Sequence, residues 1–252
     1  MFGFNRLILI GFHLLLGFAF TLPMIPGFYG LLIIVLGCLS IILNKNKNNE
    51  ALLFASYLVG AEVFLRMTQG VVLYETGKYG VLLFLIIGAW LGKNTNKPNL
   101  SFVFYILLML LGIVFTSVPE GESIRKAIVF NLSGPILLGF CAIYFYKRIV
   151  NKETIYKALF VMLLPILSMS SYLYFRTPNI EEIVFGGVAN FYTSGGFGPN
   201  QVATVLGLGI FISGVFLFSR KKLSGFLLID LIILIYLTYR GLLTFSRGGL
   251  AA

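Results

Sequence analysis

The chain has 252 residues, of which 58% are hydrophobic and 11% are charged, and its mean hydropathy is +0.95. Soluble domains are about 45–50% apolar and about 25% charged, so this composition excludes a soluble globular protein. The formal charge of +10 comes from basic residues that stand in ones, twos and threes between apolar runs. That pattern argues against a nucleic-acid-binding surface and predicts no nucleic-acid partner.

Nine long apolar runs follow one another along the chain. A membrane-spanning helix needs about 20 apolar residues, and the runs lack the alternation that is typical of barrel strands. Backbone groups in hydrocarbon must also be satisfied within the segment, which favours helices. We therefore predict an all-α, polytopic integral membrane protein with about nine transmembrane helices plus the start of a tenth, forming a single domain over 1–252 in the lipid bilayer. The predicted spans are 7–22, 28–43, 51–65, 79–91, 100–118, 127–146, 155–175, 201–219 and 223–239.

The first run follows Arg6 and lacks small residues at a cleavage position, so we interpret it as a retained span and not as a signal peptide. It contains His13, the only histidine, which has no second histidine, cysteine or acid at ligand spacing. Cys38 and Cys141 also fall inside apolar runs. These three residues therefore indicate packing, and the sequence predicts neither a metal site nor a cofactor.

The positions of lysine and arginine predict the orientation of the chain. With the N-terminus in the cytoplasm, twelve of the 19 basic residues lie on the inner side and seven on the outer side. The outer set is Arg66, Lys78, Arg125, Lys126, Arg176, Arg240 and Arg247. The inner set is mostly lysine and the outer set mostly arginine, and the planar arginine fork suits phosphate or carboxylate.

Some of these outer cations have acidic neighbours in the sequence. Glu62 precedes Arg66 by four residues, and Glu122 precedes Arg125 and Lys126 by three and four. Such spacings favour ordinary pairs at helix ends. For Arg66, Arg125 and Lys126 this is the preferred interpretation.

The longest hydrophilic stretch, 176–200, is predicted to be an outward-facing loop. It is rich in glycine, proline and asparagine but also contains apolar residues, which indicates a folded loop at the membrane surface. It ends in Gly198-Pro199-Asn200-Gln201, where Asn200 is a favoured N-cap for the next span. The start of that helix is either an anion site or simply a well-capped helix.

One charged residue lies in the ninth run and another directly follows it. Asp230 is predicted to lie in its middle, where a charge costs about 2.5–3.5 kcal/mol on insertion scales. It is either a functional residue or an acid that is protonated or hydrogen-bonded to a tyrosine or serine of a neighbouring helix. Arg240 comes seven residues before Arg247, which is two helical turns, so both share a face if the helix continues.

The turn Gly198-Pro199-Asn200-Gln201 is followed, one hairpin of spans later, by Leu242-Leu243-Thr244-Phe245-Ser246-Arg247-Gly248-Gly249. This order of motifs resembles the O-antigen ligase and O-antigen polymerase superfamily. The resemblance implies a glycosyltransferase of surface polysaccharide or lipopolysaccharide biosynthesis, located in the bacterial inner membrane. Such an enzyme moves glycan from an undecaprenyl-diphosphate carrier to an acceptor glycan or lipid A core on the outer face. It also implies metal-independent chemistry in which outward arginines bind the diphosphate.

Arg247 matches the arginine of the family's Ser-Arg-Gly motif, while Arg240 and Arg176 are added from their outward charge. The predicted diphosphate-binding residues are Arg247, Arg240, Arg176, Ser246 and Asn200. The family's catalytic histidine follows in a large later loop, so here it is expected beyond Ala252, and we expect a C-terminally truncated chain that is inactive alone. One alternative is a transporter or flippase subunit whose substrate path is lined by Asp230 and the outer arginines. Another is a structural membrane subunit without chemistry.

Overall fold

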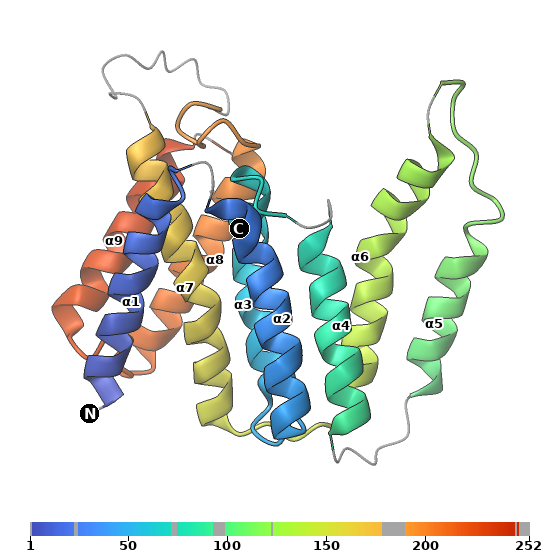
Figure 1. Cartoon of the computed structure of the whole chain (residues 1–252), viewed down its shortest axis with the longest axis horizontal. Helices are drawn as coiled ribbons and strands as arrows, with labels where there is room; N and C mark the ends of the chain where they lie inside the picture. Colours follow the sequence, from blue (N-terminus) through green and yellow to red (C-terminus); the bar gives the residue numbers. More distant parts are fainter. Residues whose placement is uncertain are drawn as a thin grey trace.

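The computed structural model describes residues 2–22, 25–71, 75–92, 99–121, 123–177, 190–244 and 246, with side chains from Asn5 onward. Over these residues the chain is all-α, as predicted, with nine helices and no strand (Figure 1). The helices are α1 (Phe2–Ala19), α2 (Pro26–Asn44), α3 (Glu50–Met67), α4 (Thr76–Leu91), α5 (Leu100–Leu111), α6 (Ile124–Phe145), α7 (Lys152–Arg176), α8 (Pro199–Phe218) and α9 (Leu227–Leu243).

Four of the helices, α2, α6, α7 and α8, are long and apolar enough to cross a membrane. Three more are apolar but shorter, namely α4, α5 and the part of α1 from Asn5. The two others carry charged residues, among them Glu62 on α3 and Arg240 on α9. The structure therefore indicates a multi-pass membrane protein, while the full set of nine crossings stays a prediction.

The predicted runs overlap the nine helices, but several ends differ. Helix α1 begins at Phe2, five residues before the first run, and α9 ends at Leu243, four residues after the ninth run. The fifth run was expected to reach residue 118, but α5 ends at Leu111 and Gly112 begins a series of turns. Glycine is a weak helix former, and the β-branched Ile113 and Val114 that follow it add little helix propensity. The ninth run was expected from residue 223, whereas α9 begins at Leu227.

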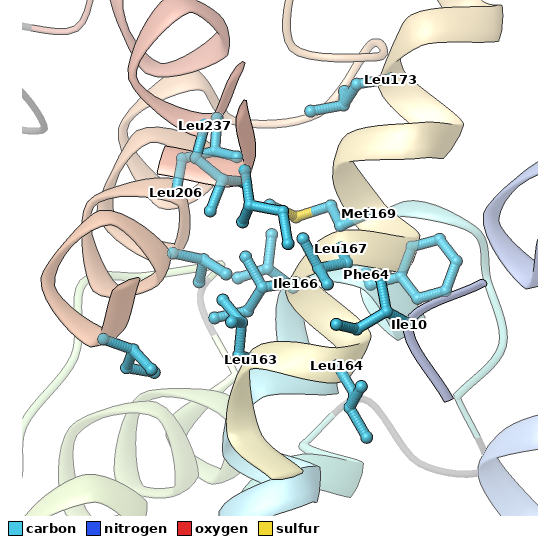
Figure 2. Packing of buried hydrophobic residues seen from close by; sticks show 14 of the residues in the cluster. Ile10, Phe64, Leu163, Leu164, Ile166, Leu167, Met169, Leu173, Leu206 and Leu237 are labelled. Atoms are coloured by element: carbon cyan, nitrogen blue, oxygen red, sulfur yellow. The ribbon is translucent and has the colours of Figure 1, made fainter. Parts of the chain in front are cut away.

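Helix α7 forms the centre of the bundle because it packs against α1, α3 and α8. Figure 2 shows its buried leucines, Ile166 and Met169 together with Ile10 of α1, Phe64 of α3, Leu206 of α8 and Leu237 of α9. Two glycines permit the close approach. A Cβ atom on Gly17 would lie 2.2 Å from the Ser168 carbonyl oxygen, and one on Gly60 would lie 2.1 Å from that of Met162. Small residues at such crossings are typical of membrane helices.

Helices α5 and α6 form a hairpin at the edge of the molecule, at the right of Figure 1. α5 packs against α6, α6 packs in turn against α4, and α5 has no buried residue. The hairpin therefore packs on the bundle mainly at α4, and Tyr144 of α6 also accepts a hydrogen bond from Asn46 Nδ2 at 3.1 Å.

Successive helices run in opposite directions, so the connections gather at two ends (Figure 1). We call the end that holds the start of α1 the N-terminal end, and the other the distal end. At the N-terminal end Arg6 Nη1 donates to the Lys222 carbonyl oxygen at 2.9 Å, and Lys221 pairs with Glu153. Connections that were predicted to share the inner side therefore lie together.

Candidate functional site

Arg240 is a buried cation in the last turn of α9, at the distal end. Only 4% of its surface is exposed. Its Nη2 atom donates to Thr177 Oγ1 at 2.8 Å and to the Thr193 carbonyl oxygen at 3.4 Å. Its Nε atom is buried and has no hydrogen-bond partner among the described residues. Within the described part of the chain the guanidinium is thus held by neutral oxygens and keeps a donor free.

The segment 190–198 lies against the end of α9. The Asn190 backbone N–H donates to the Thr244 carbonyl oxygen at 3.0 Å. The Asn190 carbonyl oxygen in turn accepts from Ser194 Oγ at 2.8 Å, and Thr193 and Ser194 are fully buried. These bonds fix the Thr193 carbonyl oxygen that Arg240 contacts.

Asn200 and Ser246, which the sequence placed in one site, are in contact. Ser246 Oγ donates to Asn200 Oδ1 at 2.8 Å. The expected N-cap role of Asn200 is wrong, because α8 begins at Pro199 after Gly198 and has no side-chain cap. The Asn200 side chain instead joins the start of α8 to the residue that precedes Arg247. Arg247 itself lies outside the described residues.

Two further arginines stand near this cluster. Arg176 ends α7 beside Thr177, and its guanidinium lies over the Tyr172 ring, 5.7 Å from the centroid. Arg66, in the last turn of α3, lies over the Phe197 ring at 5.6 Å. Arg240, Arg176, Asn200, Ser246 and Arg66 thus all lie at the distal end, and among them Asn200 and Ser246 are in direct contact. Their role as one diphosphate site stays a prediction.

Thr177 and Thr193 were not predicted as part of the site. Neither belongs to a motif, and each contributes only because α7 and the 190–198 segment meet the end of α9. A threonine in a loop carries no local signal of such a contact. Only the tertiary arrangement reveals it.

No negative charge among the described residues compensates the charge of Arg240. Within the described part of the chain the ion pairs are Lys78 with Glu75 and Lys221 with Glu153, and no carboxylate contacts Arg240. Glu181 and Glu182 lie outside the described residues. Burial of a charge costs several kcal/mol unless a partner offsets it, and a guanidinium with a free donor suits an oxyanion.

Asp230 has a different place from the one expected. It lies in the first turn of α9, at the N-terminal end of the bundle and not in the middle of the helix, and is 3% exposed. Its carboxylate accepts from the Leu223 and Ser224 backbone N–H groups, each at 2.8 Å, and from Ser224 Oγ at 2.5 Å. These donors come from the preceding loop, not from a neighbouring helix, and they explain the later start of α9. Asp230 and Arg240 lie at opposite ends of that helix.

His13 packs inside the bundle, as predicted. Its Nδ1 atom lies 2.8 Å from the Leu9 carbonyl oxygen, and its Nε2 atom lies 3.0 Å from the Tyr57 hydroxyl. Among the described residues, no group of three or more His, Cys, Asp or Glu side chains could hold a metal ion. His13 thus has its two nitrogens engaged at the α1–α3 contact.

No protein-family model, curated protein or solved structure matches this chain. The chemistry of the distal end is therefore the basis on which a function can be assigned.

Proposed function

We propose that the chain is a membrane glycosyltransferase component of the O-antigen ligase and polymerase type, and that its distal end binds the diphosphate of an undecaprenyl-diphosphate-linked glycan. The observation that carries this proposal is the buried guanidinium of Arg240. Among the described residues its Nε atom has no hydrogen-bond partner and no carboxylate contacts it. A phosphate-bearing ligand supplies the missing negative charge.

The arrangement around Arg240 suits a diphosphate in particular. Its guanidinium is fixed by Thr177 and Thr193 before any ligand arrives. Fixed donors stabilise the charge that develops on a departing group without having to reorganise. In the proposed reaction the diphosphate is that leaving group. Arg247, next to Ser246, and Arg176, next to Thr177, are the proposed further ligands.

The proposed membrane placement agrees with this role. We place all nine helices across the bilayer, the N-terminus in the cytoplasm and the distal end on the outer face of the bacterial inner membrane. Phe191 and Tyr192 are exposed on the 190–198 segment, and exposed aromatic rings are favoured at headgroup level. A lipid-linked glycan would then meet Arg240 at the interface, with an acceptor glycan or lipid A core as the proposed acceptor.

Binding of a short-chain polyprenyl diphosphate to the purified chain in nanodiscs tests the proposal. We expect Arg240→Ala to weaken binding about 10- to 100-fold, because a hydrogen bond to a charged group contributes about 1.5–3 kcal/mol and about 1.4 kcal/mol is tenfold. Arg240→Lys keeps the charge but loses the planar fork of donors. Its affinity should therefore fall between those of wild type and Arg240→Ala. Arg220→Ala, an exposed cation at the N-terminal end, is the matched control. The proposal would be contradicted if Arg240→Ala bound the diphosphate as tightly as wild type. It would also be contradicted if wild type bound the polyprenol without diphosphate equally well.

A second variant separates ligand binding from pairing within the chain. If Glu181 or Glu182 neutralised Arg240, Glu181→Gln with Glu182→Gln would lower the unfolding temperature as much as Arg240→Ala does. Under the proposal the acid variant leaves stability unchanged and binds the diphosphate at least as well as wild type.

A further inference from the structure

A second feature of the distal end is a cavity of about 1220 Å³ between the start of α4 and the start of α6. Glu75 and Tyr79 line it from the α4 side, and Arg125, Lys126, Val129 and Phe130 line it from α6. Small-molecule sites occupy about 300–1,000 Å³, so the space is large enough for part of a lipid. Its lining shares no residue with the Arg240 cluster.

The acid of this cavity is already neutralised. Glu75 is 4% exposed, pairs with Lys78 at 2.5 Å, and its Oε2 atom accepts from Ser133 Oγ at 3.1 Å. Lys78 Nζ also donates to Ser133 Oγ at 3.0 Å. This network ties α4 to α6 at one wall of the cavity, so Glu75 contributes little net charge there.

The two basic residues that line the cavity, unlike its acid, have no ion-pair partner among the described residues. Arg125 and Lys126 are exposed, and neither is in an ion pair with a carboxylate of the described residues. Their sequence neighbour Glu122, with which helix-end pairs were predicted, lies outside the described residues. The cavity therefore presents two positive groups beside a neutralised acid.

One turn further along α6 the lining becomes apolar. Val129 and Phe130 are exposed, and four residues of helix correspond to about 6 Å along the axis. Positive groups toward the membrane surface and apolar groups deeper match a molecule with an anionic head and a hydrocarbon tail. A soluble phosphate would use only the first part of this lining.

We infer that the cavity between α4 and α6 binds an anionic phospholipid, with the phosphate on Arg125 and Lys126 and an acyl chain along Val129 and Phe130. The inference requires that the helices lie in a membrane but does not depend on the proposed glycosyltransferase role. The phospholipid would occupy the space beside the α5–α6 hairpin, whose helix α6 packs against α4.

Native mass spectrometry of the chain, purified in a neutral detergent and titrated with phosphatidylglycerol, tests the inference. Wild type should retain one lipid tightly, and Arg125→Gln with Lys126→Gln should weaken this binding at least tenfold. The control, Arg220→Gln with Lys222→Gln, removes the same charge from exposed positions at the N-terminal end and should bind like wild type. Equal retention by wild type and the Arg125/Lys126 variant would overturn the inference.

A cavity-filling variant tests the space rather than the charge. Ala127 lines the cavity, and Ala127→Trp should also expel the lipid while the helical circular dichroism spectrum stays unchanged. Phosphatidylcholine with the same chains should bind at least tenfold more weakly than phosphatidylglycerol, and glycerol 3-phosphate should not displace the lipid. Equal binding of the zwitterionic lipid, displacement by the free headgroup, or a lipid retained by folded Ala127→Trp would each overturn the inference.

The two distal sites can be tested independently. Arg240→Ala should keep its phosphatidylglycerol, and the Arg125/Lys126 variant should keep its affinity for polyprenyl diphosphate. Loss of both ligands in either variant would contradict a separate lipid site.

Discussion

The two buried charges of α9 are accommodated in opposite ways. Asp230 accepts three hydrogen bonds from residues 223 and 224, so its charge is satisfied within one loop. Arg240 contacts only neutral oxygens among the described residues and keeps Nε free. A buried charge that is fully bonded indicates a structural role. A buried charge that is only partly hydrogen-bonded is the better candidate for binding a ligand.

The role of Asp230 can be tested by substitution. Asp230→Ala leaves the Leu223 and Ser224 backbone N–H groups without acceptors, and each unsatisfied buried donor costs about 1–3 kcal/mol. We expect a clear loss of unfolding free energy, measured by denaturation in mixed micelles, with polyprenyl diphosphate binding unaffected in the folded fraction. Ser224→Ala removes one donor and should cost less. A stable Asp230→Ala chain that loses ligand would instead favour the substrate-path interpretation.

At this scale the sequence predicts motif residues better than their partners. Asn200 and Ser246 were assigned to one site because each belongs to a recognisable string, and the structure joins them. Thr177 and Thr193 were missed because their contact with Arg240 depends on residues 47 to 63 positions away. Asp230 was predicted in the middle of a span because residues 223–226 continue the apolar run, although they form a loop that the Asp230 carboxylate stabilises.

At the level of helices, the bundle depends on close crossings of α7 with α1 and α3. Gly17 and Gly60 meet carbonyl oxygens of α7, which are backbone atoms and cannot swing aside. Helix positions were predictable because apolar runs are long and have clear breakers. The sequence did not predict which face of each helix packs against protein, because lipid-facing and protein-facing side chains are equally apolar.

Gly60→Ala tests these crossings. The added Cβ would lie 2.1 Å from the Met162 carbonyl oxygen, so α3 and α7 must move apart, and overpacking costs about 1–3 kcal/mol. We expect the unfolding free energy to fall by that order. Gly11→Ala on α1 is the control, because its Cβ would meet nothing within 4 Å and alanine is the better helix former. If both variants are as stable as wild type, the close α3–α7 contact is wrong.

On the scale of the whole molecule, the two ends have different chemistry. The N-terminal end is rich in lysine. Side chains of Arg6, Lys221 and Arg148 link its connections to one another. Arg148, for example, donates from Nη2 to Asn49 Oδ1 at 3.2 Å. The distal end holds the buried Arg240 and the α4–α6 cavity. Charge alternation along the sequence predicted this division. It gave no sign of the cavity, which depends on how the α5–α6 hairpin stands against α4.

The predicted orientation can be measured by cysteine labelling in spheroplasts of a bacterial host. In a chain with Cys38 and Cys141 replaced by alanine, Tyr192→Cys should react with a membrane-impermeant maleimide in intact spheroplasts. Lys47→Cys should react only after permeabilisation. Both positions are exposed in the structure, so poor accessibility would not explain a negative result. The reverse pattern would place the distal end in the cytoplasm and remove the basis for an outer-face substrate.

The position of α7 between α1 and α3 also has a consequence for the order of assembly during synthesis. Ser171 Oγ donates to the Leu14 carbonyl oxygen at 2.8 Å, a contact between residues 157 positions apart. At about 5–20 residues per second, α1 leaves the ribosome roughly 8–31 s before its partner on α7. During that interval α1 lacks the helix against which it packs. The first six helices therefore form an incomplete intermediate, because the bundle cannot close around its centre before α7 has been synthesised.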